Sequence, residues 1–263
     1  MQRWPWQESA AHDLRSDPGQ RFERLSNFVP KGWHLMTYAV IPAKGFTGAK
    51  QRLATFLEPH ERRVLACAML TDTLTACSQA TGLDGVGVVT CERDVADVAA
   101  ALGAEVLWEP RTQGHSQAVA FGVQVCCQRG VAAMLTMPGD IPLLTAADVQ
   151  AIVAPPDPPV PVVLVPNRDD LGTNAILLSP PDCLPLAFGH DSFQRHLRLA
   201  AERHLGVEIR RIPRVALDID EPGDLALFAA QRVSCHSLQA LVTLGILERL
   251  ERTFSLQSRE RVS

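Results

Sequence analysis

The sequence predicts an α/β protein with a mostly parallel sheet, and three observations support this fold class. Short apolar segments alternate with segments of helical periodicity between Met36 and Arg232. The apolar segments are nearly continuous, which is typical of strands that are covered on both faces. Several helical segments end at a glycine, such as Gly103 and Gly130. Strands that alternate with helices form βαβ units, so helices are expected on both faces of the sheet.

The individual elements follow from the same periodicities. Strands are expected over residues 37–43, 85–90, 105–107, 132–137, 161–165, 175–178, 208–212 and 217–219. Helices are expected over residues 59–78, 94–102, 116–129, 145–153, 193–205 and 222–232. Thr145 and Asp148 have the spacing of a capping box, which predicts a helix that begins after Thr145.

Three zones are expected along the chain. Residues 1–35 lack periodicity and are interpreted as a flexible N-terminal arm. Residues 36–233 form the α/β domain, with a stiff proline-rich connector at 155–161. Residues 234–263 carry leucines at helical spacing and are expected to form a C-terminal amphipathic helix, packed on the domain or on a second subunit of a homodimer.

Composition excludes several classes of function. The chain has 263 residues and a net charge of −4, which gives no electrostatic reason to bind nucleic acid or an acidic membrane. No apolar run reaches about 18 residues, so no transmembrane span is expected, and the N-terminal segment is not expected to be a secretory signal. The seven cysteines include no C-x-x-C pair and are expected to be buried thiols in a reducing compartment. A cytoplasmic protein with a small anionic ligand fits these features.

A basic loop follows the first predicted strand. It contains Lys44, Lys50 and Arg52 together with Gly45 and Gly48. Its spacing matches neither the P-loop nor the G-x-G-x-x-G fingerprint. Glycines allow backbone N–H groups to approach phosphates, and the three cations could neutralise a triphosphate. A solvated basic loop without a ligand is an equally good interpretation of this segment alone.

Asp140 stands directly after the predicted strand at 132–137, between Gly139 and Pro142. Ligands of parallel α/β proteins bind beyond the carboxyl ends of the strands, where Asp140 is expected to lie. A carboxylate fixed at this edge is suited to hold a metal ion. The alternative is an aspartate that only stabilises a turn or caps a helix.

A second acidic segment contains Asp218 and Asp220. If residues 217–219 form a strand, these two side chains point to the same side, about 6.5 to 7 Å apart. Two like charges held together are unfavourable unless a cation neutralises them, and hard oxygen ligands suit Mg²⁺. The alternative is that Asp220 or Glu221 caps the helix that begins at Pro222.

Two polar turns complete the candidate site. Gly172-Thr173-Asn174 precedes a predicted strand, and Phe188-Gly189 precedes a helix for which Ser192 is a natural N-cap. A helix N-terminus that follows a glycine is suited to bind an anion, although capping alone explains Ser192. His190 and His196 are interpreted as ordinary helix-end and surface residues.

Taken in order, five segments resemble one family: Ile41-Pro42-Ala43-Lys44 with Lys50-x-Arg52-Leu53, Gly139-Asp140-Ile141-Pro142-Leu143-Leu144, Gly172-Thr173-Asn174, Phe188-Gly189-x-x-Ser192-Phe193, and Leu217-Asp218-Ile219-Asp220-x-Pro222-x-Asp224-Leu225. The chain is similar, from Thr37 to Ala230, to the guanylyltransferases of deazaflavin coenzyme (F-420) biosynthesis, the CofC/FbiD type. The resemblance implies a three-layer α/β/α nucleotidyltransferase fold, Rossmann-like and similar to the enzymes that attach nucleotides to molybdopterin.

The resemblance also implies substrates and site residues. GTP would be the donor, and the acceptor would be 2-phospho-L-lactate, phosphoenolpyruvate or 3-phospho-D-glycerate, with a downstream transferase of the same pathway as a partner. Asp140, Asp218 and Asp220 would hold Mg²⁺, and Thr173, Gly189 and Ser192 would bind the acceptor. Lys44, Lys50, Arg52 and Asp140 would be catalytic. The nucleotide is expected at Pro42, Ala43, Lys44, Thr90, Gly114, Ser116, Pro138 and Gly139.

One departure from the family pattern concerns the nucleotide site. The family's Gly-Leu-Asn-x-Ala stretch reads Gly114-His115-Ser116-Gln117-Ala118 here, so Ser116 stands in the place of the asparagine. Another nucleotidyltransferase, of molybdopterin or a sugar phosphate, is the nearest alternative function. A non-catalytic GTP-binding module is the alternative from another class. A Rossmann oxidoreductase is poorly supported, because the glycine fingerprint is missing.

Overall fold

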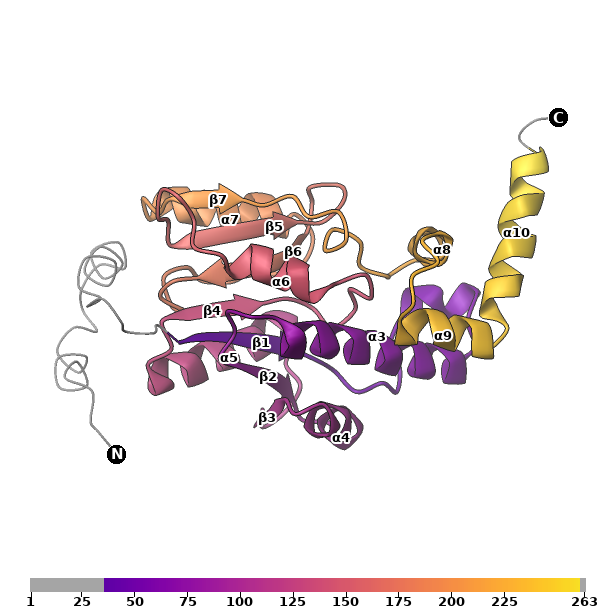
Figure 1. Cartoon of the computed structure of the whole chain (residues 1–263), viewed down its shortest axis with the longest axis horizontal. Coiled ribbons are helices and arrows are strands. Elements are labelled where there is room, and N and C mark those ends of the chain that lie inside the picture. The colour runs from indigo at the N-terminus through magenta and orange to yellow at the C-terminus, as the bar shows by residue number, and fades with distance from the viewer. Residues whose placement is uncertain (1–35, 261–263) are drawn as a thin grey trace.

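The computed structural model describes residues 36–260, and its centre is a seven-stranded sheet with the order β3-β2-β1-β4-β6-β5-β7 (Figure 1). The strands are β1 Thr37–Pro42, β2 Gly85–Thr90, β3 Glu105–Trp108, β4 Ala133–Thr136, β5 Val162–Pro166, β6 Thr173–Leu178 and β7 Val207–Ile209. All neighbouring pairs are parallel except those that include β6. The mostly parallel sheet expected from the sequence is therefore confirmed.

The antiparallel direction of β6 has a consequence for function. A parallel strand presents its last residues at the carboxyl edge of the sheet, whereas an antiparallel neighbour presents its first residues there. Thr173 and Asn174 begin β6, so they lie at the edge where β1 and β4 end. Alternation of apolar segments alone does not reveal this direction.

The helices cover both faces of the sheet (Figure 1). They are α3 Pro59–Gln79, α4 Arg93–Ala101, α5 His115–Arg129, α6 Ala146–Val153, α7 Ser192–Glu202, α8 Pro222–Ala230, α9 His236–Thr243 and α10 Ile246–Glu260, with a short 3₁₀ helix, η1, at Gln51–Thr55. The expected capping box is confirmed, because Thr145 and Asp148 bond reciprocally at the start of α6.

Alternate residues of β1 serve the two faces. Ala39 and Ile41 belong to a buried cluster with residues of α3, α4 and α6, whereas Tyr38 and Val40 belong to a cluster with residues of α5 and α7. Successive side chains of a strand point to opposite faces, so continuous apolar segments fill both layers. The three-layer α/β/α architecture is confirmed.

The C-terminal segment forms two helices, not the single helix expected. The break between α9 and α10 falls at Gly245, whose φ of 65° lies in the left-handed region that favours glycine. Both helices attach to α3: Asp72 accepts hydrogen bonds from the backbone N–H groups of His236 and Ser237, and Arg249 forms a two-bond ion pair with Glu61. With α8 they lie beyond the carboxyl ends of the strands (Figure 1).

Two strand predictions need correction. No strand forms at residues 217–219, and the strand expected at 208–212 is the shorter β7. Leu217 and Ile219 are apolar because they pack in the cluster of the C-terminal helices, not because they pair in the sheet. The arm expected at residues 1–35 lies outside the described residues. None of the described helices combines the length and the apolar character needed to cross a bilayer.

Candidate active site

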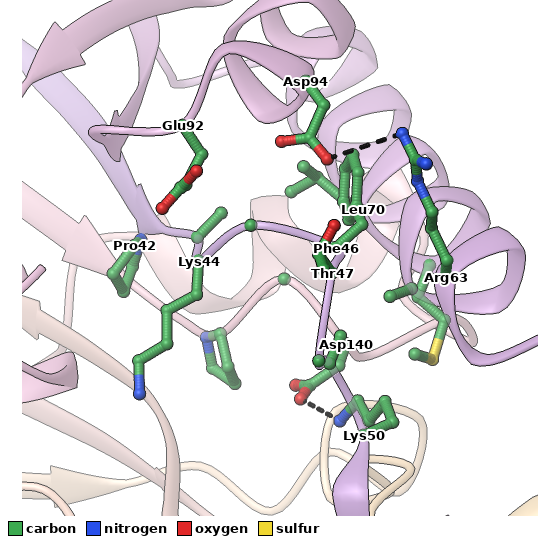
Figure 2. Close-up of a pocket in the computed structure, with 18 of the residues that line it drawn as sticks. Pro42, Lys44, Phe46, Thr47, Lys50, Arg63, Leu70, Glu92, Asp94 and Asp140 are labelled. Carbon is green, nitrogen blue, oxygen red and sulfur yellow. Dashed lines mark hydrogen bonds and ion pairs between the residues drawn. The ribbon is translucent and has the colours of Figure 1, made fainter. Parts of the chain in front are cut away.

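A cavity of about 1080 Å³ opens at the carboxyl edge of the sheet, where β1 and β4 end. The loop between β1 and η1 forms much of its wall, and the turn at Pro138–Asp140 forms another part (Figure 2). Gly139 lies so close to α3 that a Cβ there would stand 2.9 Å from Cδ1 of Leu70. A larger residue would push the Leu70 side chain aside, so glycine allows the turn to pack closely against the helix.

The basic loop supplies cations to this cavity, as expected. Lys44, Lys50 and Arg52 all line it, together with Pro42 and Ala43. Lys44 extends across the cavity away from Asp140 (Figure 2). Within the described part of the chain, no ion pair joins Lys44 to a carboxylate. Its ammonium is therefore available to an anionic ligand.

Lys50 has a different environment, because it joins two of the three aspartates. Its Nζ contacts Oδ2 of Asp140 and lies 3.0 Å from Oδ1 of Asp220 (Figure 2 shows the first contact). Burial opposes the charge on Lys50, but the two carboxylates outweigh burial and raise its pKa. Lys50 also has a φ of 52°, which is an unfavourable value for a residue other than glycine.

The third aspartate lies next to this pair. Asp218 is half-buried and accepts a hydrogen bond of 3.1 Å from the amide of Asn174 at the start of β6. Burial raises the pKa of Asp218, and the negative charges of Asp140 and Asp220 raise it further. The three carboxylates are thus close enough for their charges to influence one another. Loops bring them there, so the argument from strand alternation was wrong in its geometry.

The helix-cap alternative for this segment is also decided. Glu221 is the N-cap of α8 and forms a capping box with Asp224, so Asp220 is not the cap. Asp220 instead faces the cavity and contacts Lys50 and Arg52. The Asp220 carboxylate is not needed at the start of α8, because Glu221 caps that helix.

The aspartates fit a divalent cation in one respect and not in another. Oδ1 of Asp140 is buried and has no hydrogen-bond partner among residues 36–260, which is costly unless a cation or a donor reaches it. However, no group of three acidic, His or Cys side chains within residues 36–260 is arranged closely enough to hold a metal ion. The ammonium of Lys50 stands between two of the carboxylates, Asp140 and Asp220.

The expected acceptor residues form a buried hydrogen-bond network beside Asn174. The Thr173 N–H donates to Oγ of Ser192 at 3.0 Å, and Oγ1 of Thr173 lies 3.1 Å from Nδ1 of His196. Ser192 is not the N-cap of α7, because Asp191 occupies that position and the Ser192 hydroxyl turns inward to Thr173. His196 is fully buried, so its interpretation as a surface residue was wrong. His190 is exposed, as expected.

Three residues that were expected to bind the nucleotide do not line the cavity. Thr90 is fully buried, and its hydroxyl accepts a hydrogen bond from the Glu92 N–H. Gly114 is the N-cap of α5, with a φ of 99°. Ser116 accepts a hydrogen bond of 3.0 Å from the backbone N–H of Phe188. Ser116 therefore fastens the loop that carries Gly189, a role that the motif did not indicate.

Sequence reasoning missed other residues of the cavity. Glu92, Thr112 and His115 line it, and so does Arg63, which is paired with Asp94 (Figure 2). Burial is the main cause that lowers the pKa of His115. The charge of Asp140 raises this pKa, and the charge of Lys44 lowers it, both by less. All these residues lie after β2 or β3 or on α3. The rule that ligands bind beyond the carboxyl ends of strands could have singled out those after β2 and β3.

Comparison with known proteins identifies the family to which this chain is similar. Residues 37–262 match the family described as Guanylyl transferase CofC like. The match includes the C-terminal helices, which the resemblance had left outside the pattern. A phosphoenolpyruvate guanylyltransferase from Conexibacter woesei is 41% identical over 83% of this chain and 98% of its own length. A 3-phospho-D-glycerate guanylyltransferase from Colwellia psychrerythraea is 35% identical over 74% and 92%.

Solved structures support the fold. A putative nucleotide-diphospho-sugar transferase from Desulfovibrio desulfuricans superposes with a TM-score of 0.66 at 15% identity, covering 81% of this chain and 96% of its own. At this identity the likeness concerns architecture alone. The family match and the named relatives are guanylyltransferases. They argue against the two alternatives of a non-catalytic GTP-binding module and an oxidoreductase. The chain belongs to the CofC-like guanylyltransferase family.

Proposed function

We propose that this protein transfers GMP from GTP to the phosphate of a small phosphorylated three-carbon acid, with release of pyrophosphate, in coenzyme F-420 biosynthesis. Phosphoenolpyruvate is the first acceptor to test, because the Conexibacter woesei relative carries that name. 3-Phospho-D-glycerate and 2-phospho-L-lactate are the other two candidates, because each appears in the name of a related guanylyltransferase.

The reaction follows from the charges of the substrates. An oxygen of the acceptor phosphate attacks the α-phosphorus of GTP, a new P–O bond forms, and the bond from the α-phosphorus to the bridging oxygen breaks as pyrophosphate leaves. The acceptor oxygen is already anionic near neutral pH, so no general base is needed. The main barrier is repulsion between two polyanions. Lys44, Lys50 and Arg52 line the cavity where this charge would gather and would offset it.

Mg²⁺ is the cofactor that the carboxylates would hold. Asp140, Asp218 and Asp220 would provide hard oxygen ligands, and Oδ1 of Asp140 has no hydrogen-bond partner in the described part of the chain. When bound, Mg²⁺ would neutralise phosphate charge and polarise the reacting phosphorus. On the protein side, Lys50 would leave its position between Asp140 and Asp220 and turn toward the phosphates of GTP.

The two substrates would occupy adjacent parts of the carboxyl edge. Pro42, Ala43, Pro138 and Gly139 line the cavity on the side of β1 to β4 and would surround the nucleotide part, together with Gly114. Thr173, Gly189 and Ser192 would bind the acid on the side of β6 and α7. Asp218 lies between these parts, because Asn174 links it to the start of β6 while Asp140 and Asp220 are its charged neighbours.

The observation that carries the proposal is the convergence of the three carboxylates, and Asp218→Asn tests it. Loss of this carboxylate should lower the rate of pyrophosphate release at least about 100-fold, the effect of removing one strong electrostatic contact in an active site. The fold should survive, because the amide removes a buried charge that two like charges oppose. Asp97→Asn, at an exposed position of α4, is the matched control and should retain full activity.

The assay offers GTP with each of the three acids and follows pyrophosphate. Near-normal turnover of Asp218→Asn with a functional acid would contradict the assigned role. Absence of turnover in the wild-type protein with all three acids would contradict the proposed substrates.

The cellular setting is part of the proposal. We expect the protein to act in the cytoplasm, as a monomer or homodimer, and to supply its guanylylated acid to a downstream transferase of the same pathway. Cell fractionation and sedimentation analysis measure the first two properties. Consumption of the product by a coupled transferase measures the third.

A further inference from the structure

His196 occupies the centre of the network around the acceptor residues. It lies on α7, is fully buried, and uses both ring nitrogens. Nδ1 is 3.1 Å from Oγ1 of Thr173, and Nε2 accepts the backbone N–H of Ala187 at 3.1 Å. The ring of Phe188 packs edge-on against it, with 5.3 Å between the ring centroids.

These contacts determine which nitrogen carries the proton. The N–H of Ala187 can only donate, so Nε2 must present its lone pair. Burial, and then the charge of Arg195, lower the pKa of His196 to about 4, so the ring is neutral at neutral pH. A neutral imidazole has one N–H, which must therefore be at Nδ1. That N–H donates to Oγ1 of Thr173.

The direction of this bond restricts the Thr173 hydroxyl. Because its oxygen accepts from His196, its own proton must point elsewhere. No other hydrogen bond of this hydroxyl exists among the described residues, and the Thr173 N–H is already used by Ser192. Thr173 begins β6, so its hydroxyl lies at the carboxyl edge of the sheet, on the side of α7. The free proton is thus held at this edge.

We propose that His196 is a positioning residue that makes the Thr173 hydroxyl an obligatory hydrogen-bond donor toward the acceptor acid. Through Ala187 the same ring also fixes the loop that carries Gly189. A hydroxyl that can only donate selects for acceptor-only oxygens, such as those of a phosphate or carboxylate. The inference rests on the proposed function, in which Thr173 contacts the acceptor.

Two isosteric substitutions separate the two bonds of the ring. His196→Asn places a side-chain N–H near the position of Nδ1, which preserves the bond to Thr173 and loses Ala187. His196→Gln places an oxygen near the position of Nε2, which preserves the bond to Ala187 and loses Thr173. His204→Gln, beyond the end of α7, is the control for the exchange itself.

The expected result is a selective loss in acceptor use. His196→Gln should raise the KM for phosphoenolpyruvate, or for whichever of the three acids is used, by about 10-fold or more, as expected for a lost hydrogen bond to a charged group. The KM for GTP should stay within about twofold. His196→Asn should raise the KM for the acceptor less than His196→Gln does, because it keeps the bond to Thr173 and loses only the bond to Ala187. Equal losses toward both substrates, or a larger loss in Asn than in Gln, would overturn the proposal.

A double-mutant cycle tests whether the effect passes through Thr173. In a Thr173→Val background the His196→Gln exchange should have no further effect on the KM of the acceptor, because the hydroxyl that it orients is gone. A full additional effect in that background would show that His196 acts by another route.

A measurement on the wild-type protein keeps the inference testable if a variant fails to fold. Long-range ¹H–¹⁵N correlation spectra report directly which imidazole nitrogen is protonated. His196 should show a protonated Nδ1 and a bare Nε2 across neutral pH. The opposite tautomer would overturn the proposal whether or not the substrates are correct, and a wild-type protein inactive with all three acids would refute only the proposed function.

Discussion

The contact of Lys50 with Asp140 and Asp220 leads to a prediction about stability and metal binding. Lys50→Met removes the ammonium and leaves three neighbouring carboxylates without this counterion. Removing one partner of a buried ion pair costs about 3–5 kcal/mol. The lysine side chain is only 10% exposed, but those of Asp140 and Asp220 are 26% and 45% exposed, so solvent screens part of this cost. An effect of about 2 kcal/mol is expected after that discount.

The assay is thermal unfolding in a chelator and in Mg²⁺. In the chelator, about 2 kcal/mol corresponds to a Tm lower by about 4–8 °C for a domain of this size. Added Mg²⁺ should raise the Tm of Lys50→Met more than that of the wild type, because the cation no longer competes with an ammonium for Asp140 and Asp220.

Arg52→Met is the control, since Arg52 is 70% exposed and lies 3.7 Å from Asp220. Surface pairs of this kind contribute about 0–1 kcal/mol, so its Tm in the chelator should change little. Two results would refute the reasoning. One is an unchanged Tm of Lys50→Met in the chelator. The other is equal stabilisation of wild type and Lys50→Met by Mg²⁺.

Two further predictions concern packing and pH. Gly122→Ala should lower the free energy of unfolding by about 1–3 kcal/mol, because a Cβ at Gly122 of α5 would stand 2.4 Å from Cγ1 of Val40. Gly223→Ala in α8 meets nothing within 4 Å and should be neutral or slightly stabilising, so equal urea denaturation curves for both variants would argue against this packing. Hydrogen bonds from Arg249 are the main cause that lowers the pKa of Glu61 in the folded protein. The ionised Glu61 therefore stabilises the fold above the unfolded pKa of about 4.3. This stabilisation is lost as the pH falls through the lower pKa of the folded protein. The stability difference between wild type and Glu61→Gln should therefore narrow from about pH 6 to pH 3, and a difference that is constant over this range would contradict the ion pair.

Much of the site could be predicted because its parts are local motifs. The basic loop after β1, the turn at Asp140 and the segment at Asp218 each follow from short patterns of glycine, proline and charge. The resemblance to one family joined them into a single site. Helix ends were equally local: Thr145 and Asp148 encode their capping box by spacing alone.

The roles of individual side chains were harder to predict from the sequence. Ser116 and Phe188 are 72 residues apart, and Thr173 and His196 are 23 apart. A histidine on a helix has the same sequence signature whether it is a surface residue or a buried partner of a threonine. Only packing decides this, because the ring becomes useful once burial keeps it neutral and two neighbours fix its tautomer.

The sequence by itself determined the layers of this protein, because periods of 2 and 3.6 residues specify which side chains face a core. It also determined the family, through five short motifs in order. Tertiary structure alone decided the direction of β6, and with it the position of Thr173 and Asn174 at the carboxyl edge. It also decided that Lys50 stands between Asp140 and Asp220, which lie 90 and 170 residues away along the chain. Such contacts depend on the pairing and packing of distant segments, for which local periodicity carries no information.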